Sequence, residues 1–112
     1  MEKNQYIPVM IQSLKKKSEI LDAIMELNIR QSEELENPAL DPDDFDKTVE
    51  EKSKQIEQLD LLDDGFQELF DRVKDDLKNH QDIYRDEIAQ MQDYIRKLTS
   101  KSATIQLSLI HI

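Results

Sequence analysis

Cysteine is absent from this sequence, and glycine occurs only once in its 112 residues. The absence of cysteine excludes disulfides, thiolate zinc sites and cysteine nucleophiles. A single glycine excludes a glycine-rich phosphate-binding loop. Aromatic residues and prolines are also few, whereas charged residues make up 36% of the chain. This composition is typical of long amphipathic helices and fits neither a β-sheet nor a disordered tail.

Residues suited to catalysis or metal binding are scarce as well. The two histidines are His80 and His111, and no Glu-x-x-His motif occurs, so a di-iron bundle is not indicated. Carboxylate pairs are frequent, but on helices this charged they are most often solvated faces. We therefore expect a binding or structural protein rather than an enzyme, with no metal and no cofactor.

Targeting signals are not evident. No unbroken apolar run follows the first five residues, as a signal peptide would require, and no apolar stretch is long enough to span a bilayer. We therefore expect a cytoplasmic protein that does not insert into membranes.

The negative charge is concentrated in one part of the chain. Residues 33–64 contain thirteen acidic residues and three lysines, which accounts for the whole formal net charge of −10. Such an acidic region repels the phosphates of nucleic acids and anionic lipids. We therefore expect no binding to nucleic acid.

A stripe of residues at alternating steps of four and three dominates the middle of the chain. Its members are Phe45, Val49, Lys52, Ile56, Leu59, Asp63, Phe66, Phe70, Val73 and Leu77. The pattern predicts one long helix over residues 42–78 that buries this stripe against other helices. Of the two charged members, we expect Lys52 to pair with glutamates and Asp63 to be hydrated. Because the stripe keeps its phase past Gly65, we expect the helix to be continuous there.

A second amphipathic stripe predicts a first helix over about residues 4–36. Its members are Ile7, Met10, Leu14, Lys17, Leu21, Ile24, Asn28, Gln31 and Leu35. Polar residues inside such a stripe commonly fix the register or the choice of partner.

The segment Asn37–Pro42 separates these two helices, because proline disfavours helix in the preceding residue. Asp41 is well placed as an N-cap, with Pro42 at the first helical position. The nearby acidic cluster does not match a calcium-binding EF-hand loop. That loop requires glycine at its sixth position, where Asp46 stands, and glutamate at its twelfth, where Lys52 stands.

The helical phase changes after Leu77. The next stripe is Tyr84, Ile88, Met91, Ile95, Leu98, Ser102 and Ile105. Either one helix continues through a stutter near His80, or the chain breaks at residues 78–81 and turns back. We favour the break, because turning back buries more surface, and predict a third helix over residues 81–106. The fold class is then all-α, as an antiparallel bundle or hairpin of two to three long helices.

The last six residues require a separate explanation. Leu107–Ile112 is the translation of CTG TCT CTT ATA CAC ATC, the mosaic end of a transposase that is widely used to prepare sequencing libraries. We expect the native domain to cover residues 1–106, with its natural C-terminus missing, and residues 107–112 to be adaptor-derived.

The middle of the chain resembles the FlgN-type flagellar type III export chaperones. The resemblance rests on Glu51-Lys52-x-x-Gln55-Ile56-x-x-Leu59-x-x-Leu62-Asp63-x-Gly65-Phe66, preceded by an acidic, proline-containing loop and a long first helix. FliT-like flagellar chaperones have a similar helical character. The resemblance implies a cytoplasmic helical protein that binds hook–filament junction subunits and brings them to the flagellar type III export machinery.

A chaperone of this kind needs an apolar groove for the terminal helices of its cargo. The third stripe could supply one, and the candidate partner-binding residues are Tyr84, Ile88, Met91, Ile95, Leu98 and Ile105. The alternative is that this stripe only closes a three-helix core. A rival function is a self-associating coiled-coil scaffold, in the simplest case a homodimer.

Overall fold

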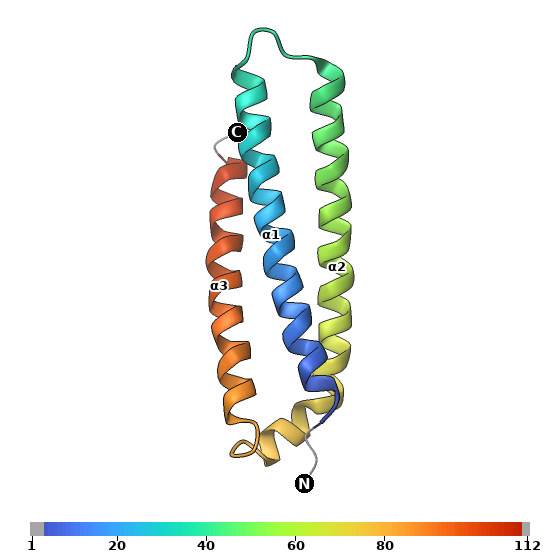
Figure 1. Ribbon diagram of the computed structural model, residues 1–112, viewed down its shortest axis with the longest axis vertical. Coiled ribbons are helices and arrows are strands. Elements are labelled where there is room, and N and C mark those ends of the chain that lie inside the picture. The colour runs from blue at the N-terminus through green and yellow to red at the C-terminus, as the bar shows by residue number, and fades with distance from the viewer. Residues whose placement is uncertain (1–3, 111–112) are drawn as a thin grey trace.

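The computed structural model describes the backbone of residues 4–110 and the side chains of residues 4–104. This part of the chain forms three long helices and no strand: α1 (Tyr6–Glu36), α2 (Pro42–Asn79) and α3 (Arg85–Ile110). The predicted all-α class is therefore confirmed. The bundle is elongated, with dimensions of 63 × 20 × 16 Å. α1 and α3 run in the same direction and α2 runs opposite to both (Figure 1).

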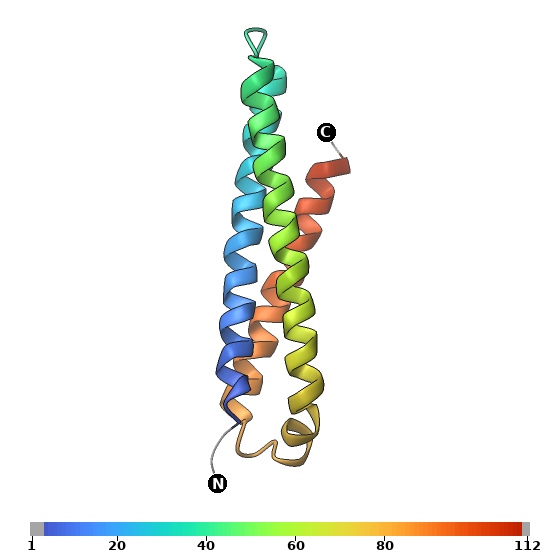
Figure 2. The same ribbon diagram turned by 90° about the vertical axis from the view of Figure 1, so that its right-hand side faces the viewer.

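α1 is the central helix of the bundle. Both α2 and α3 pack along α1, whereas no Cα atom of α2 lies within 8 Å of one in α3. Figure 1 shows α1 between the other two helices, and Figure 2 shows α3 diverging from the α1–α2 pair toward its C-terminal end. We call the end with the α2–α3 turn proximal and the end with the α1–α2 loop distal. The side between α2 and α3 is not covered by a fourth described helix.

The α1–α2 loop forms as its residue types predict. The Asn37 side chain accepts a hydrogen bond from the Ala39 N–H at 2.9 Å, which stabilises the turn after α1. The Asp41 side chain accepts one from the Asp43 N–H at 3.0 Å and caps α2, with Pro42 in the first turn. The prediction of Asp41 as the N-cap is confirmed.

The chain breaks after α2 rather than continuing through a stutter. The His80 N–H donates to the Asp76 carbonyl at 3.0 Å, and the His80 carbonyl accepts from the N–H groups of Ile83 and Tyr84. These turns occupy residues 80–84, so α3 begins at Arg85, four residues later than predicted. The two earlier helices lie within two residues of their predicted bounds.

The hydrophobic core lies mainly in the proximal half. Its buried members are Ile7, Met10, Leu14, Ile20, Leu21, Ile24, Val73, Leu77, Tyr84, Met91 and Leu98. All three helices and the α2–α3 turn contribute to it. In α2 only Val73 and Leu77, near its C-terminal end, are buried apolar residues.

The predicted α2 stripe is wrong at three of its apolar positions, while Leu77 at its end is buried as predicted. Val49, Ile56 and Phe70 are exposed, and the positions one residue earlier, Thr48, Gln55 and Leu69, turn inward instead. The inward-facing line is Phe45, Thr48, Lys52, Gln55, Leu59, Leu62, Phe66, Leu69 and Val73. From Phe45 the observed line advances by three residues and then by four, whereas the predicted stripe advances by four and then by three. The observed line and the predicted stripe therefore coincide at every seventh residue. Hydropathy favoured Val49 over Thr48 and Ile56 over Gln55, but the position of α1 decides which flank is covered.

Two further expectations concern single segments. α2 runs without interruption through Gly65, as predicted. α3 continues through residues 107–110, while His111 and Ile112 lie outside the described residues. The helical backbone of residues 107–110 does not bear on where these residues come from, so their adaptor origin stays a prediction.

Candidate functional site

An apolar groove runs between α2 and α3, with α1 as its floor. Its proximal section has a volume of about 670 Å³ and its middle section has a volume of about 450 Å³. Phe66 of α2 and Ile95 of α3 line both sections, so the sections form one continuous groove. Met10 and Leu14 contribute the floor from α1. The groove occupies the side of the bundle on which α2 and α3 do not meet.

Four of the six predicted partner-binding residues line this groove: Ile88, Met91, Ile95 and Leu98. Ile95 is 46% exposed and is therefore accessible to a partner. Met91 and Leu98 are each 6% exposed and belong to the core. The third stripe thus closes the core with one edge and lines the groove with the other, and its role in binding a partner stays a prediction.

The other two predicted residues do not contribute to the described groove. Tyr84 is fully buried and lines neither section. The side chain of Ile105 lies outside the described residues.

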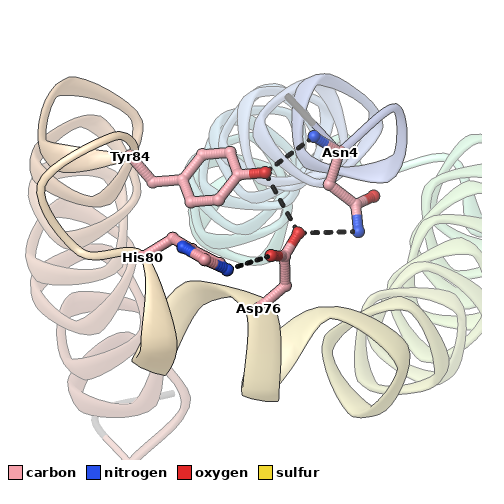
Figure 3. Close-up of polar contacts among 4 residues, drawn as sticks. All are labelled: Asn4, Asp76, His80 and Tyr84. Carbon is pink, nitrogen blue, oxygen red and sulfur yellow. Dashed lines mark hydrogen bonds and ion pairs between the residues drawn. The ribbon is translucent and has the colours of Figure 1, made fainter. Parts of the chain in front are cut away.

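Tyr84 instead belongs to a polar cluster at the proximal end (Figure 3). Its hydroxyl donates to Asp76 Oδ2 at 3.0 Å and accepts from the Asn4 N–H at 2.8 Å. Asn4 Nδ2 lies 3.4 Å from the same Asp76 oxygen, and His80 Nε2 lies 3.7 Å from Asp76 Oδ1. The cluster joins the start of α1 to the end of α2 and to the turn. It holds the proximal end of the groove in place.

Only part of this cluster could be anticipated from the residue types. A buried tyrosine hydroxyl requires a hydrogen-bond partner, so Tyr84 in an apolar stripe indicates that some polar group lies opposite it. Nothing in the spacing identified Asn4 or Asp76 as that group. They come from positions 80 and 8 residues away in the chain.

Two ion pairs connect α1 to the walls of the groove. Lys17 Nζ lies 2.5 Å from Asp63 Oδ1, and both residues line the middle section. Lys101 of α3 lies 2.9 Å from Asp22 and donates a hydrogen bond to Ser18. Asp63 is half-exposed, as expected, but it is paired, which the sequence analysis did not predict.

The distal half of the α1–α2 pair contains a polar layer. Gln31 Nε2 donates to Thr48 Oγ1 at 3.3 Å, and Lys52 Nζ donates to Gln31 Oε1 at 3.4 Å. Burial lowers the pKa of Lys52. Among the described residues Lys52 forms no ion pair, so the predicted pairing with glutamates is wrong. The Asn28 side chain is 3% exposed and both of its amide atoms lack a hydrogen-bond partner.

Two further features of the described residues concern metal binding and membrane-spanning helices. Within residues 4–104 no group of three or more histidine, cysteine, aspartate or glutamate side chains is arranged to hold a metal ion. None of the helices, over the residues that the structure describes, is long and apolar enough to cross a membrane. The groove is therefore the strongest candidate for a functional site.

No protein-family model, curated protein or solved structure gives a significant match to the chain.

Proposed function

We propose that the protein is a cytoplasmic flagellar export chaperone. It binds an amphipathic helix of a hook–filament junction subunit in the groove between α2 and α3 and brings the subunit to the type III export apparatus. The observation that carries the proposal is the uncovered side of the bundle. α1 has two neighbouring helices, and the position diagonal to it, where a fourth helix of a bundle would pack, is a groove lined with apolar side chains.

The resemblance to FlgN-type chaperones adds a second, independent support. Three residues of the resembling segment, Leu62, Asp63 and Phe66, line the middle section of the groove. A subunit whose amphipathic helices pack in a filament needs a substitute apolar surface before assembly. A groove between two helices can supply that surface by contacts at helical spacing.

Co-purification with each flagellar junction subunit tests the proposal. We expect the wild-type protein to retain at least one subunit and Ile95→Glu to retain much less, because a carboxylate would enter the groove. Leu61→Glu is the matched control, since Leu61 is 72% exposed and lies outside the groove lining. Met91→Glu is a poorer test because Met91 belongs to the core and its substitution would also destabilise the fold.

The circular dichroism spectra of both variants should match the wild type, so that lost binding reports on the groove. If no junction subunit is retained and the protein elutes as a defined homo-oligomer, the self-associating scaffold replaces the chaperone. In that case Ile95→Glu should change the oligomeric state instead.

A further inference from the structure

The proximal section of the groove has a positive rim. Lys74, Lys78 and Arg85 line it together with a single acidic residue, Asp82. Lys74 lies 4.0 Å from Asp71, whereas Lys78 and Arg85 form no ion pair with another described residue. In a chain with a net charge of −10, this local excess of positive charge is unusual.

The α2 edge of the groove changes sign toward the distal end. Residues seven apart lie on one line along a helix, so the lines through Lys74 and Lys78 can be followed along α2. The first line continues through Gln67, Asp60, Ser53 and Asp46, and the second through Asp71, Asp64, Glu57 and Glu50. All eight side chains are exposed. The edge therefore bears lysines at the proximal end and six carboxylates along the rest of its length, of which Asp71 pairs with Lys74 and Glu50 pairs with Lys54.

Apolar side chains beside this edge continue beyond the two groove sections, interrupted by the ion-paired Asp63. Asp63 and Phe70 line the groove, and Ile56 and Val49 continue the same seven-residue spacing on the distal side. Ile56 and Val49 are 45% and 44% exposed. From Phe70 to Val49 the surface extends for roughly 32 Å at 1.5 Å per residue. That length matches a partner helix of about 21 residues.

We propose that the groove binds an amphipathic helix in one direction. The partner's acidic C-terminal end lies between Lys78 and Arg85, and its basic N-terminal end lies along the acidic distal edge of α2. This inference rests on the proposed function, because it concerns the helix that the groove binds. It adds the charge pattern and the orientation of that helix.

The macrodipole of the partner adds to its interaction with the charged side chains of α2, whereas its interactions with the parallel α2 and the antiparallel α3 macrodipoles are opposite in sign. The C-terminus of a helix has a partial negative charge and the N-terminus a partial positive charge, so each end meets the opposite sign on α2. The partner then runs parallel to α2 and antiparallel to α3. Because the charged residues border the groove and are exposed, their main effects are on orientation, association rate and salt dependence.

Synthetic peptides provide the test. The probe is a helical peptide of about 24 residues in which leucines follow one another at alternating steps of three and four residues. Its other positions are mainly lysine in the first half and glutamate in the second half. A comparison peptide has the same residues with lysine and glutamate alternating along its length. Fluorescence anisotropy measures both affinities at low ionic strength and at about 0.5 M salt, where the charges are screened.

The first expected result concerns affinity. The polarised peptide should bind about tenfold more tightly than the comparison peptide at low ionic strength, and the difference should shrink at high salt. The double variant Lys74→Glu/Lys78→Glu should remove the preference. Lys15→Glu/Lys16→Glu changes the net charge equally at exposed α1 positions outside the groove, and should keep the preference.

The second expected result concerns direction. Because the chain has no cysteine, Gln81→Cys in the proximal lining gives a single site for disulfide cross-linking. A cysteine at the C-terminus of the polarised peptide should cross-link to it, and one at the N-terminus should not. Ser53→Cys should give the opposite result.

The outcomes separate this inference from the proposed function. If both peptides bind with equal affinity and either end cross-links to Gln81→Cys, the directional inference is overturned while binding in the groove stands. If neither peptide binds, and junction subunits bind equally to wild type and Ile95→Glu, the groove is not the binding site and both proposals fail.

Discussion

The proximal and distal halves of this bundle are stabilised by different interactions. In the proximal half three helices share an apolar core that includes Met10, Val73 and Tyr84, each with no exposed surface. In the distal half α1 and α2 enclose the polar residues Asn28, Gln31 and Thr48 beside Leu27, while Val49 and Ile56 remain exposed. The sequence is strongly amphipathic along both halves. The two halves differ because α3 packs on the apolar residues of the proximal half and not on those at the distal end.

Stability is unevenly divided along the molecule. Burial of apolar side chains is the dominant stabilising contribution to folding, and here it is concentrated where α3 packs. The distal half has weaker interactions, because hydrogen bonds of the kind between Gln31 and Thr48 each contribute only about 1 kcal/mol net. The same half bears the excess of acidic residues, which repel one another. We therefore expect the distal half to open more readily than the proximal half.

The largest expected effect tests this division directly. Met10→Ala should destabilise the protein by about 2–5 kcal/mol, because it leaves a cavity where all three helices meet. Ile56→Ala is the matched distal change and should cost less than about 1 kcal/mol, because nearly half of Ile56 is already exposed. Urea unfolding of both variants measures the difference. Similar losses in the two variants would show that the halves are equally well packed.

A smaller effect is expected at the polar cluster of the proximal end. Tyr84→Phe removes the hydroxyl that donates to Asp76 and accepts from the Asn4 N–H, so it should cost about 1–3 kcal/mol. Tyr94→Phe is the control, because the Tyr94 hydroxyl forms no hydrogen bond with another described side chain or backbone group. Thermal unfolding compares the two. An equally small change in both would mean that the cluster does not contribute to proximal stability.

The distal polar layer gives the third prediction. Lys52→Met should be neutral or stabilising by up to about 1 kcal/mol at neutral pH, because Lys52 forms no ion pair among the described residues and its partial burial disfavours the charge. Since burial lowers the pKa of Lys52 in the folded state, the unfolded chain binds more protons between that pKa and 10.5. The stability of the wild type should therefore rise with pH through this alkaline window.

Lys52→Met should lack this contribution to the alkaline rise. Lys54→Met is the control, because Lys54 is exposed and, among the described residues, pairs only with Glu50 on the same helix, and it should keep the rise. Urea unfolding at neutral and alkaline pH measures both variants. Strong destabilisation of Lys52→Met at neutral pH would mean that Lys52 neutralises a buried acid after all.

The sequence was sufficient for the helices and insufficient for the details of their packing. Proline, N-cap and periodicity signals identified three helices and their breaks, because these signals are local. Local sequence does not determine whether Val49 or Thr48 faces inward, because both residues lie beside the line through Phe45 and Lys52 that the predicted and observed faces have in common. It depends on where α1 lies, and hydropathy alone selected the wrong one.

The groove was only partly predictable for the same reason. Periodicity placed Ile88, Met91, Ile95 and Leu98 on one face, and all four line the groove. The opposite wall, with Phe66 and Phe70, was assigned to a buried stripe because nothing in the sequence indicates that α2 and α3 stay apart. The partners of Tyr84 and Lys17 were also missed, because contacts between residues distant in sequence leave no pattern at short range.

The smallest expected effect lies near the border between the two halves, at Gly65. This residue lies within α2, and a Cβ atom built on it would meet no atom within 4 Å. Gly65→Ala should therefore stabilise the protein by roughly 0.5–1 kcal/mol, since alanine restricts the unfolded chain and favours helix without a clash. Because the gain belongs to α2 rather than to the core, amide hydrogen exchange should slow mainly along α2 around residue 65. The control is Ala103→Gly at an exposed α3 position that borders the middle section of the groove, and it should lose a similar amount of stability. If Gly65→Ala instead destabilises the protein, α2 must need flexibility or a close approach at this point, and the two halves would be joined by a hinge rather than by one continuous helix.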